Sequence, residues 1–167
     1  MIEAGQAAPD FALASCDAEA VSLSDFAGRA LVLYFYPKDN TPGCTNEAQD
    51  FRDRLDAFEA AGCAVAGVSP DTVKRHCNFR DKYALNFTLL ADPEKQALQA
   101  YGVWQEKKNY GRTYMGVVRT TVLIDGEGVV RQVWEKVRVR RKVKRDGEKV
   151  EVSHADDVLA AARALAQ

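Results

Sequence analysis

Apolar residues in this chain form short continuous runs that alternate with longer stretches of helical spacing. Residues 31–36 are a run of aliphatic and aromatic side chains, which predicts a strand buried on both faces. The run stops at Pro37, which cannot donate a hydrogen bond to a neighbouring strand. Residues 42–61 then place apolar side chains on one helical face, namely Phe51, Leu55 and Phe58. We therefore predict a buried strand that leads through a short turn into a long helix.

The same alternation of strand and helix continues along the chain. Residues 63–69 predict a second buried strand, and the helix expected after it runs from the Ser-Pro pair at its start over residues 69–83. A short strand is predicted at 87–92, and a further helix at 92–102. This alternation favours an α/β fold in which helices cover both faces of a sheet.

Hairpin and cap signals mark the two ends of the chain. Apolar and polar residues alternate on either side of residues 15–20, which predicts an N-terminal β-hairpin with Cys16 near its tip. The Asp-Gly-Glu-Gly sequence at 125–128 separates two further apolar runs and predicts another hairpin. Ser153 and Asp156 form a capping box that predicts the start of the last helix.

Two stretches depart from this pattern. Residues 104–116 show no clear period and predict a long functional or mobile loop. Residues 136–149 contain eight lysines and arginines, with valines between them and an Asp-Gly pair at 146–147. We interpret this second stretch as part of a β-hairpin with one basic face. Its charge is explained either by exposure to solvent or by contact with an anionic partner or another subunit.

Length and charge limit the class of protein. A chain of 167 residues can bury a core of its own, so residues 1–167 are expected to form a single domain. The formal net charge of −1 argues against general binding of nucleic acid. The N-terminus lacks a basic segment followed by an apolar core, and no stretch approaches the ~20 apolar residues of a membrane span. We therefore expect a cytoplasmic protein that does not enter a membrane.

The cysteines do not follow a metal-binding pattern. The four are Cys16, Cys44, Cys63 and Cys77. They form no C-x-x-C pair and none of the short spacings that are typical of zinc sites. His76 is adjacent to Cys77, but neighbouring residues of a helix point about 100° apart. The sequence thus predicts neither a metal nor an organic cofactor.

Cys44 occupies the position with the most distinctive chemistry. Thr41 is a candidate N-cap, Pro42 suits the first helical position, and Cys44 then falls in the first turn. Unpaired backbone N–H groups and the positive end of the helix dipole stabilise a thiolate there, which is the nucleophilic form of cysteine. A buried and inert cysteine is the alternative that these residues alone leave open.

The same residues carry a resemblance to a known family. Pro37, Thr41 and Cys44 form Pro-x-x-x-Thr-x-x-Cys, which resembles the active-site motif of peroxiredoxins. The segment YFYPKDNTPGCTNEAQDF is similar to the Q-type, or bacterioferritin-comigratory, subfamily over nearly every residue. The resemblance implies a thioredoxin-like fold, in which helices flank a central mixed β-sheet, and an antioxidant peroxidase that uses a thiol. It also places the 104–116 loop near the edge of the active site.

The resemblance assigns roles to further residues. Cys44 is the peroxidatic cysteine, while the Thr41 hydroxyl and the backbone N–H of Gly43 contact the peroxide oxygens. Pro37 shields the pocket. Arg119 interrupts an apolar strand, where an unpaired guanidinium is costly, so the residues alone already predict an anionic partner such as the Cys44 thiolate or Glu47. By resemblance, Arg119 also favours the thiolate and donates to the peroxide.

The residue that resolves the Cys44 sulfenic acid is left open. Many Q-type proteins have a second cysteine five residues after the first, but this chain has Gln49 there. Another subgroup has its resolving cysteine in the next helix, at the position that aligns with Arg80 of this chain. Cys77 lies in that helix, three residues before Arg80. Cys77 could act after local unwinding. A one-cysteine mechanism with an external thiol is the main alternative, followed by resolution through Cys16 or Cys63.

The resemblance implies a thiol-dependent peroxidase that reduces hydrogen peroxide and organic hydroperoxides. Thioredoxin or another small dithiol protein would recycle it, and a monomer is expected rather than a dimer. Q-type relatives pass almost directly from the last strand to the last helix, so the hairpin at 136–152 is interpreted as an insertion. The alternative function is a redox-regulated binding or holdase module that acts through the basic residues 136–149. A thiol–disulfide exchanger is disfavoured by the lack of C-x-x-C.

Overall fold

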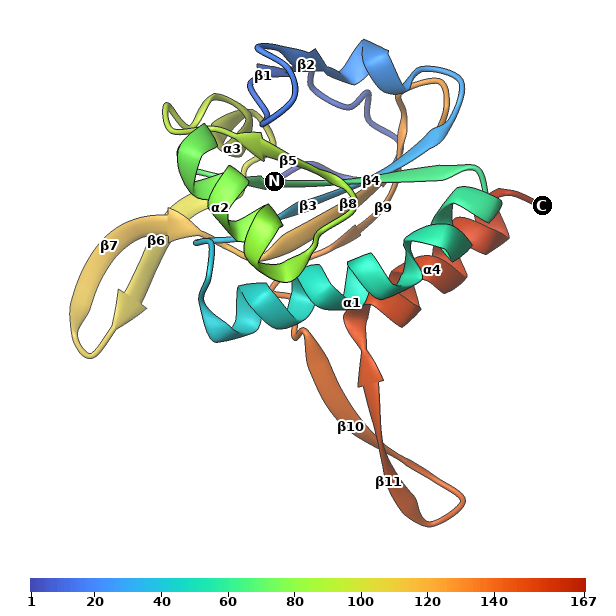
Figure 1. The fold of residues 1–167 in the computed structure, drawn as a ribbon. Helices are drawn as coiled ribbons and strands as arrows, with labels where there is room; N and C mark the ends of the chain where they lie inside the picture. Colours follow the sequence, from blue (N-terminus) through green and yellow to red (C-terminus); the bar gives the residue numbers. More distant parts are fainter.

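The computed structural model describes residues 1–167, and its centre is a mixed five-stranded sheet (Figure 1). The strands, in spatial order, are β5 (Thr88–Ala91), β4 (Cys63–Ser69), β3 (Ala30–Phe35), β8 (Thr120–Ile124) and β9 (Val130–Trp134). The first three run parallel, and β8 and β9 are antiparallel to their neighbours. The predicted mixed sheet is therefore confirmed, although the central strand ends one residue earlier than expected.

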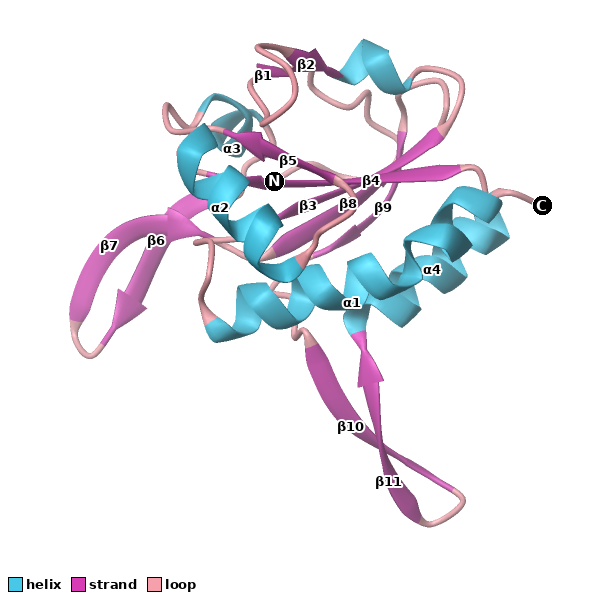
Figure 2. Ribbon diagram, viewed as in Figure 1, coloured by secondary structure: helices cyan, strands magenta, loops and turns pink.

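Helices and the N-terminal segment cover the two faces of this sheet (Figure 2). One face carries α1 (Pro42–Ala60), α2 (Val73–Tyr83) and α4 (His154–Leu165). The other carries α3 (Gln96–Ala100) and the N-terminal segment. Side chains of β3 alternate between the two cores, because successive residues of a strand point to opposite faces: Val32 and Tyr34 enter the first core, and Leu31, Leu33 and Phe35 enter the second.

Two helices are shorter than the sequence predicts. α2 begins at Val73 rather than near residue 69, because Ser69 still belongs to β4 and Thr72 is the N-cap, accepting a hydrogen bond from the Arg75 backbone N–H. α3 begins at Gln96, and the Asp92 carboxylate accepts from the backbone N–H groups of Gln96 and Leu98. The Thr72 cap sets where α2 starts, whereas α3 starts only after Lys95, whose positive φ lies outside the right-handed helical region.

The N-terminal hairpin is confirmed. β1 (Ala12–Leu13) pairs antiparallel with β2 (Val21–Ser22), and a 3-10 helix, η1 (Leu23–Phe26), follows. The connection between the two strands contains Cys16. The hairpin packs its apolar side chains into the second core, so its tip is held against the body of the protein.

The predicted loop at 104–116 is wrong. This stretch is a hairpin of β6 (Trp104–Asn109) and β7 (Arg112–Val117), closed by Tyr110 and Gly111, which both have positive φ values. Positive φ at two central residues is typical of a tight hairpin turn. The strands were missed because most of their side chains are polar and exposed, which removes the alternation that marks a half-buried strand. The hairpin projects from the end of the molecule where α1 begins (Figure 1).

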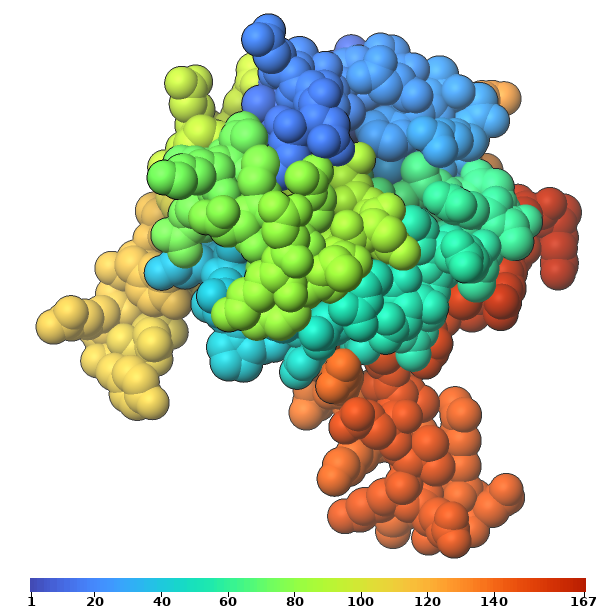
Figure 3. Space-filling view, in the orientation of Figure 1, coloured from blue at the N-terminus to red at the C-terminus, as the bar shows by residue number.

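A second hairpin projects from the body below α1 (Figures 1 and 3). β10 (Arg140–Arg145) pairs antiparallel with β11 (Glu148–Ser153), and Asp146 and Gly147 close the turn with positive φ. Its paired strands begin at residue 140, four residues after the basic stretch starts. Hairpin formation thus agrees with the prediction, while its status as an insertion stays a prediction. Among the helices, none is both long and apolar enough to cross a bilayer.

Candidate functional site

Cys44 lies in the first turn of α1, directly after the turn that leaves β3. Thr41 is the N-cap with an extended backbone, Pro42 occupies the first helical position, and only 1% of Cys44 is exposed. The unpaired N–H groups of this first turn and the helix dipole act on the sulfur. The predicted helix start, with Cys44 in its first turn, is therefore present.

Arg119 reaches Cys44 from a segment 75 residues away. It lies immediately before β8, not inside an apolar strand as the sequence suggested. Its Nη2 donates to the Cys44 Sγ at 3.2 Å, and its Nη1 donates to Glu47 Oε1 at 2.7 Å. Burial acts to lower the pKa of Arg119, but Glu47 and Cys44 together raise the pKa above its ordinary value. The guanidinium is thus held as a cation between a sulfur and a carboxyl group.

Glu47 is buried one turn into α1 on the same side as Cys44. Burial raises the pKa of the Glu47 carboxyl to about 7, although the Arg119 charge acts in the opposite direction. Its second oxygen, Oε2, is buried and has no hydrogen-bond partner. Desolvation therefore outweighs the ion pair, and the carboxyl group changes charge close to neutral pH.

The other predicted residues lie around the same helix start. The Thr41 hydroxyl donates to the Lys38 carbonyl oxygen at 2.9 Å, which leaves the Thr41 oxygen free to accept. At Gly43 an added Cβ would come within 3.3 Å of Arg119 Nη2, so glycine gives the guanidinium room. Pro37 is half-buried at the end of β3. The structure thus brings Thr41, Gly43, Cys44 and Arg119 together at the start of α1, while Pro37 lies in the turn that leads to it.

A buried polar network beneath this turn was not predicted. His76 Nδ1 lies 2.6 Å from Asp39 Oδ2, and the Tyr36 hydroxyl donates to Asp39 Oδ1 at 2.6 Å. The Asp39 backbone N–H donates to the Asp71 carboxylate at 2.8 Å. These residues come from separate segments, so no local sequence pattern could have revealed the network. It connects the turn before Cys44 to α2.

The same network contains three potential metal ligands. Atoms of Asp39, Asp71 and His76 lie within 4.8 Å of one another. Each already has protein partners: Asp71 accepts from Ser69, and His76 Nε2 lies 3.1 Å from the Leu90 carbonyl oxygen. Internal hydrogen bonds therefore account for this cluster without a metal.

The remaining cysteines are arranged in two ways. Cys16 and Cys77 form a disulfide with a Cα–Cα distance of 5.6 Å, a normal separation for this bond. Cys63 is free and buried in β4, and burial raises its pKa to about 12. Cys63 is therefore unreactive at neutral pH. Cys77 is bonded to the N-terminal hairpin and not to Cys44, a pairing that the sequence did not indicate.

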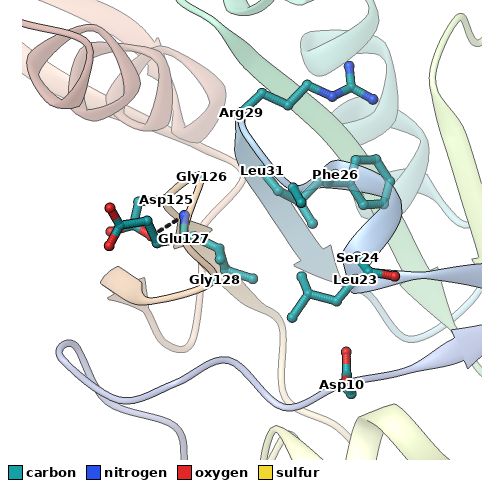
Figure 4. A pocket seen from close by; sticks show the side chains of 12 residues that line it. Asp10, Leu23, Ser24, Phe26, Arg29, Leu31, Asp125, Gly126, Glu127 and Gly128 are labelled. Carbon is teal, nitrogen blue, oxygen red and sulfur yellow. Dashed lines mark hydrogen bonds between the residues drawn. The ribbon is translucent and has the colours of Figure 1, made fainter.

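A separate pocket of about 190 Å³ lies at the opposite end of β3 (Figure 4). Leu31 at the start of β3, Phe26 of η1 and the 125–128 turn line it, and the turn is closed by the Glu127 N–H donating to Asp125 Oδ1 at 3.0 Å. Cys44 instead follows the other end of the strand. The pocket contains no thiol and is not part of the Cys44 site.

Comparison with known proteins gives consistent matches. Residues 4–133 match the AhpC/TSA family. Peroxiredoxin Bcp of Bacillus subtilis is 49% identical over 142 residues, which cover 85% of this chain and 90% of that protein. Peroxiredoxin Bcp of Escherichia coli is 43% identical over 134 residues, covering 80% of this chain and 86% of that protein.

Solved structures agree with these matches. Peroxiredoxin Q of Xanthomonas campestris superposes with a TM-score of 0.82 and 41% identity, covering 94% of this chain and 92% of that chain. A structure of the Xanthomonas campestris bacterioferritin comigratory protein with the same TM-score, identity and coverage concerns its alkyl peroxide reduction activity. A mutant of PrxQ from Xylella fastidiosa superposes with a TM-score of 0.84 and 32% identity over 100% of this chain and 99% of that chain.

Proposed function

This chain belongs to the AhpC/TSA family as a thiol-dependent peroxidase of the Bcp and Q type, and from that premise we propose that Cys44 is its peroxidatic cysteine. The observation that carries the proposal is the 3.2 Å contact between Arg119 Nη2 and the Cys44 sulfur. A guanidinium at this distance stabilises a thiolate, and the start of α1 acts in the same direction. Cys63 is the weaker candidate, because burial raises its pKa to about 12 even though the charge of Arg29 acts in the opposite direction.

The proposed reaction is a displacement at the O–O bond. The Cys44 thiolate attacks the OH oxygen of the hydroperoxide, the O–O bond breaks, and Cys44 becomes a sulfenic acid. The leaving alkoxide or hydroxide takes up a proton to give an alcohol or water. Thr41 Oγ1, whose hydrogen is donated to Lys38, accepts from the O–H of the hydroperoxide. Arg119 and the Gly43 backbone N–H stabilise the negative charge that develops on the leaving oxygen.

Glu47 and Pro37 are proposed to act indirectly. Glu47 positions Arg119 through the 2.7 Å ion pair, so that the second nitrogen of the guanidinium points at the sulfur. Pro37 is half-buried before the turn and limits access of water. Both are positioning residues, because neither contacts the reacting atoms.

Peroxides and a thioredoxin-type reductant are the substrates of this family, and we extend this to both hydrogen peroxide and organic hydroperoxides. The alkyl peroxide activity named for the Xanthomonas relative supports this breadth. Cys77 is our proposed resolving cysteine, with an external thiol as the alternative. We also propose that residues 1–167 act as one domain in the cytoplasm, as a monomer and without nucleic acid.

The test of this function is peroxide consumption measured by stopped flow. Cys44→Ser should reduce the rate by about 10³-fold or more, since a hydroxyl is a poor nucleophile at neutral pH. Cys63→Ala is the matched control, because this buried thiol lies outside the site and should leave the rate unchanged. Equal rates for Cys44→Ser and the wild type would contradict the proposal.

The β10–β11 hairpin supports a second candidate function. Lys142, Lys144 and Lys149 are exposed on it, whereas Arg140 and Arg141 form ion pairs with the body. A binding or holdase activity through residues 136–149 would survive Cys44→Ser and would be lost when the three lysines are neutralised. Binding of an acidic client measured with both variants separates this role from peroxidase activity.

A further inference from the structure

The Cys16–Cys77 disulfide links two segments that are 61 residues apart, the tip of the N-terminal hairpin and α2. An ion pair joins the same two segments, since Arg80 Nη1 donates to Asp17 Oδ1 at 3.1 Å. Figure 3 shows the N-terminal segment lying directly on the atoms of α2. The pairing of Cys16 with Cys77 is therefore the one that folded α2 favours.

Cys77 faces away from the turn that precedes Cys44. Cys77 and Arg80 are three residues apart and share the side of α2 that contacts the hairpin. Lys82 lies on another side and donates to Asn40 Oδ1 at 3.2 Å, in the turn before Cys44. A bond between Cys44 and Cys77 thus requires part of α2 to unwind or rotate.

The three sulfurs also differ in exposure. Cys44 is almost fully buried, whereas Cys16 and Cys77 are half-buried. A surface hollow of about 330 Å³ lies beside Cys16 and includes Asp17, Glu19 and Val73 in its lining. An external dithiol must bring its sulfur into line with a disulfide, and it can do so at Cys16 with α2 folded.

From these observations we propose that Cys16 is a second resolving cysteine, which receives the disulfide from Cys44 and presents it to the reductant. The proposal rests on the peroxidatic role of Cys44 proposed above. In the first exchange the Cys77 thiolate attacks the sulfur of the Cys44 sulfenic acid, and hydroxide leaves and is protonated to water. The Cys16 thiolate then attacks Cys77, the Cys44–Cys77 bond breaks, and Cys44 leaves as a thiolate.

Refolding of α2 drives the second exchange. The Cys44–Cys77 disulfide keeps α2 distorted and disrupts contacts such as that of His76 with Asp39, whereas Cys16–Cys77 is compatible with the folded helix. The second disulfide is therefore the more stable of the two. An external dithiol reduces it, taking up two oxidising equivalents and returning Cys16 and Cys77 to thiols. Cys44 is free again before the reductant acts.

This transfer of the disulfide from Cys44 through Cys77 to Cys16, called the relay below, predicts an unusual stoichiometry. One equivalent of hydrogen peroxide should convert the reduced chain to the Cys16–Cys77 disulfide with a free Cys44 thiol. A second equivalent should then oxidise Cys44 to a sulfenic acid that dimedone labels, because Cys77 is no longer available. Rapid acid quenching, alkylation and peptide mass spectrometry on the full chain follow both species.

Cys16→Ser provides the decisive variant. This variant should accumulate the Cys44–Cys77 disulfide after one equivalent of peroxide. Its turnover with thioredoxin or dithiothreitol should slow by about tenfold, because the Cys44–Cys77 disulfide is less accessible to the reductant than Cys16–Cys77. Cys63→Ala is the control and should behave as the wild type. Absence of Cys44–Cys77 in Cys16→Ser, or failure of one equivalent to form Cys16–Cys77 in the wild type, overturns the relay.

Cys44→Ser separates this proposal from the function on which it rests. If Cys44→Ser still forms Cys16–Cys77 with peroxide at the wild-type rate, Cys44 is not the point of entry, and both the proposed function and the relay fail. If Cys44→Ser is inactive and the wild type forms no Cys16–Cys77, Cys44 remains the peroxidatic residue and the relay alone fails.

Discussion

The reactivity proposed for Cys44 depends on a few charged neighbours. Arg119 bridges the Cys44 sulfur and the Glu47 carboxyl group. The charge on the Glu47 carboxyl group therefore affects how strongly Arg119 attracts a negative charge on the Cys44 sulfur. Burial makes these interactions stronger than they would be in water, and it also makes an unpaired charge costly. The consequences can be tested one side chain at a time.

Replacement of Arg119 by lysine should impair the peroxidase reaction. A lysine ammonium is a point charge that cannot contact the sulfur and the carboxylate with a rigid two-pronged geometry. We expect Arg119→Lys to lower the second-order rate constant with hydrogen peroxide by about 10²-fold, a loss of about 3 kcal/mol. Stopped-flow fluorescence measures this rate constant. The matched control is Arg131→Lys, at an exposed surface arginine. A loss smaller than about threefold would contradict the proposed role.

Two buried groups should change the stability of the protein with pH in opposite directions. The pKa of Glu47 is raised to about 7, so the folded state holds this proton more tightly than the unfolded chain, and stability falls as pH rises from about 4.5 to 7. Burial lowers the pKa of His154 to about 4. The folded state therefore binds this proton less tightly than the unfolded chain, and the stability that neutral His154 contributes is lost as pH falls from about 6.5 to 4. The two effects oppose each other in the wild type.

Single variants should separate these effects. Glu47→Gln removes the titration of Glu47. The free energy of unfolding of this variant, relative to the wild type, should therefore increase by about 3 kcal/mol between pH 4.5 and 7. His154→Gln should show the reverse difference, a relative loss of about the same size as pH rises from 4 to 6.5. Urea unfolding at several pH values measures both. A difference that does not vary with pH would show that the group titrates normally.

The elements of this fold differ in how firmly they are attached. The sheet and α1 share the buried core, whereas β6–β7 and β10–β11 project from it (Figure 1). Tyr110 at the tip of β6–β7 is 98% exposed. The base of β10–β11 is held by ion pairs, with Arg140 donating to both oxygens of Asp50 at 2.8 and 3.1 Å and Arg141 paired with Asp157. Two of the basic residues therefore attach the hairpin instead of serving a partner.

Loss of the Arg140–Asp50 pair should loosen the β10–β11 hairpin. Arg140→Ala is expected to accelerate amide hydrogen exchange in residues 140–153, while the global free energy of unfolding changes by less than about 1 kcal/mol, because a half-exposed ion pair contributes little. Lys142→Ala, on the same strand and without an ion pair, is the control. Equal exchange in the two variants would mean that the pair does not hold the hairpin.

The molecule as a whole combines a large core with one covalent link across its surface. The core fixes the sheet order and the helices, and the Cys16–Cys77 disulfide ties the N-terminal hairpin to α2. Closing a loop of this length restricts the unfolded chain more than the folded one. Redox state should therefore alter global stability.

Oxidation of Cys16 and Cys77 should stabilise the full chain. For a sequence separation of 61 residues, the gain in free energy of unfolding is at most about 4 kcal/mol. Urea unfolding with and without dithiothreitol measures it, and Cys77→Ser should remove the difference between the two conditions. A reduced wild type as stable as the oxidised one would show that the disulfide does not constrain unfolding.

Most of the α/β core and the position of Cys44 could be predicted from the sequence. The strand that ends at Pro37, the cap at Thr41 and the helix start that bears Cys44 are local features, because neighbouring residues alone produce them. The need of Arg119 for an anionic partner also followed from a charged side chain in an apolar sequence, although Arg119 lies just before β8 and not inside the strand. By contrast, β6–β7 was missed because polar, exposed strands lack the alternation on which the prediction depends.

Only the tertiary structure decided which distant residues meet. Cys44 with Arg119, Asp39 with His76 and Cys16 with Cys77 are pairs separated by 75, 37 and 61 residues. Strand order, register and helix rotation set such contacts, and a rotation of about 100° per residue separates a cysteine that faces Cys44 from one that faces the N-terminal hairpin. The sequence by itself therefore specified the helix start that bears Cys44 and the need of Arg119 for an anionic partner, while the folded chain determined that Arg119 contacts both Cys44 and Glu47 and that Cys77 is bonded to Cys16.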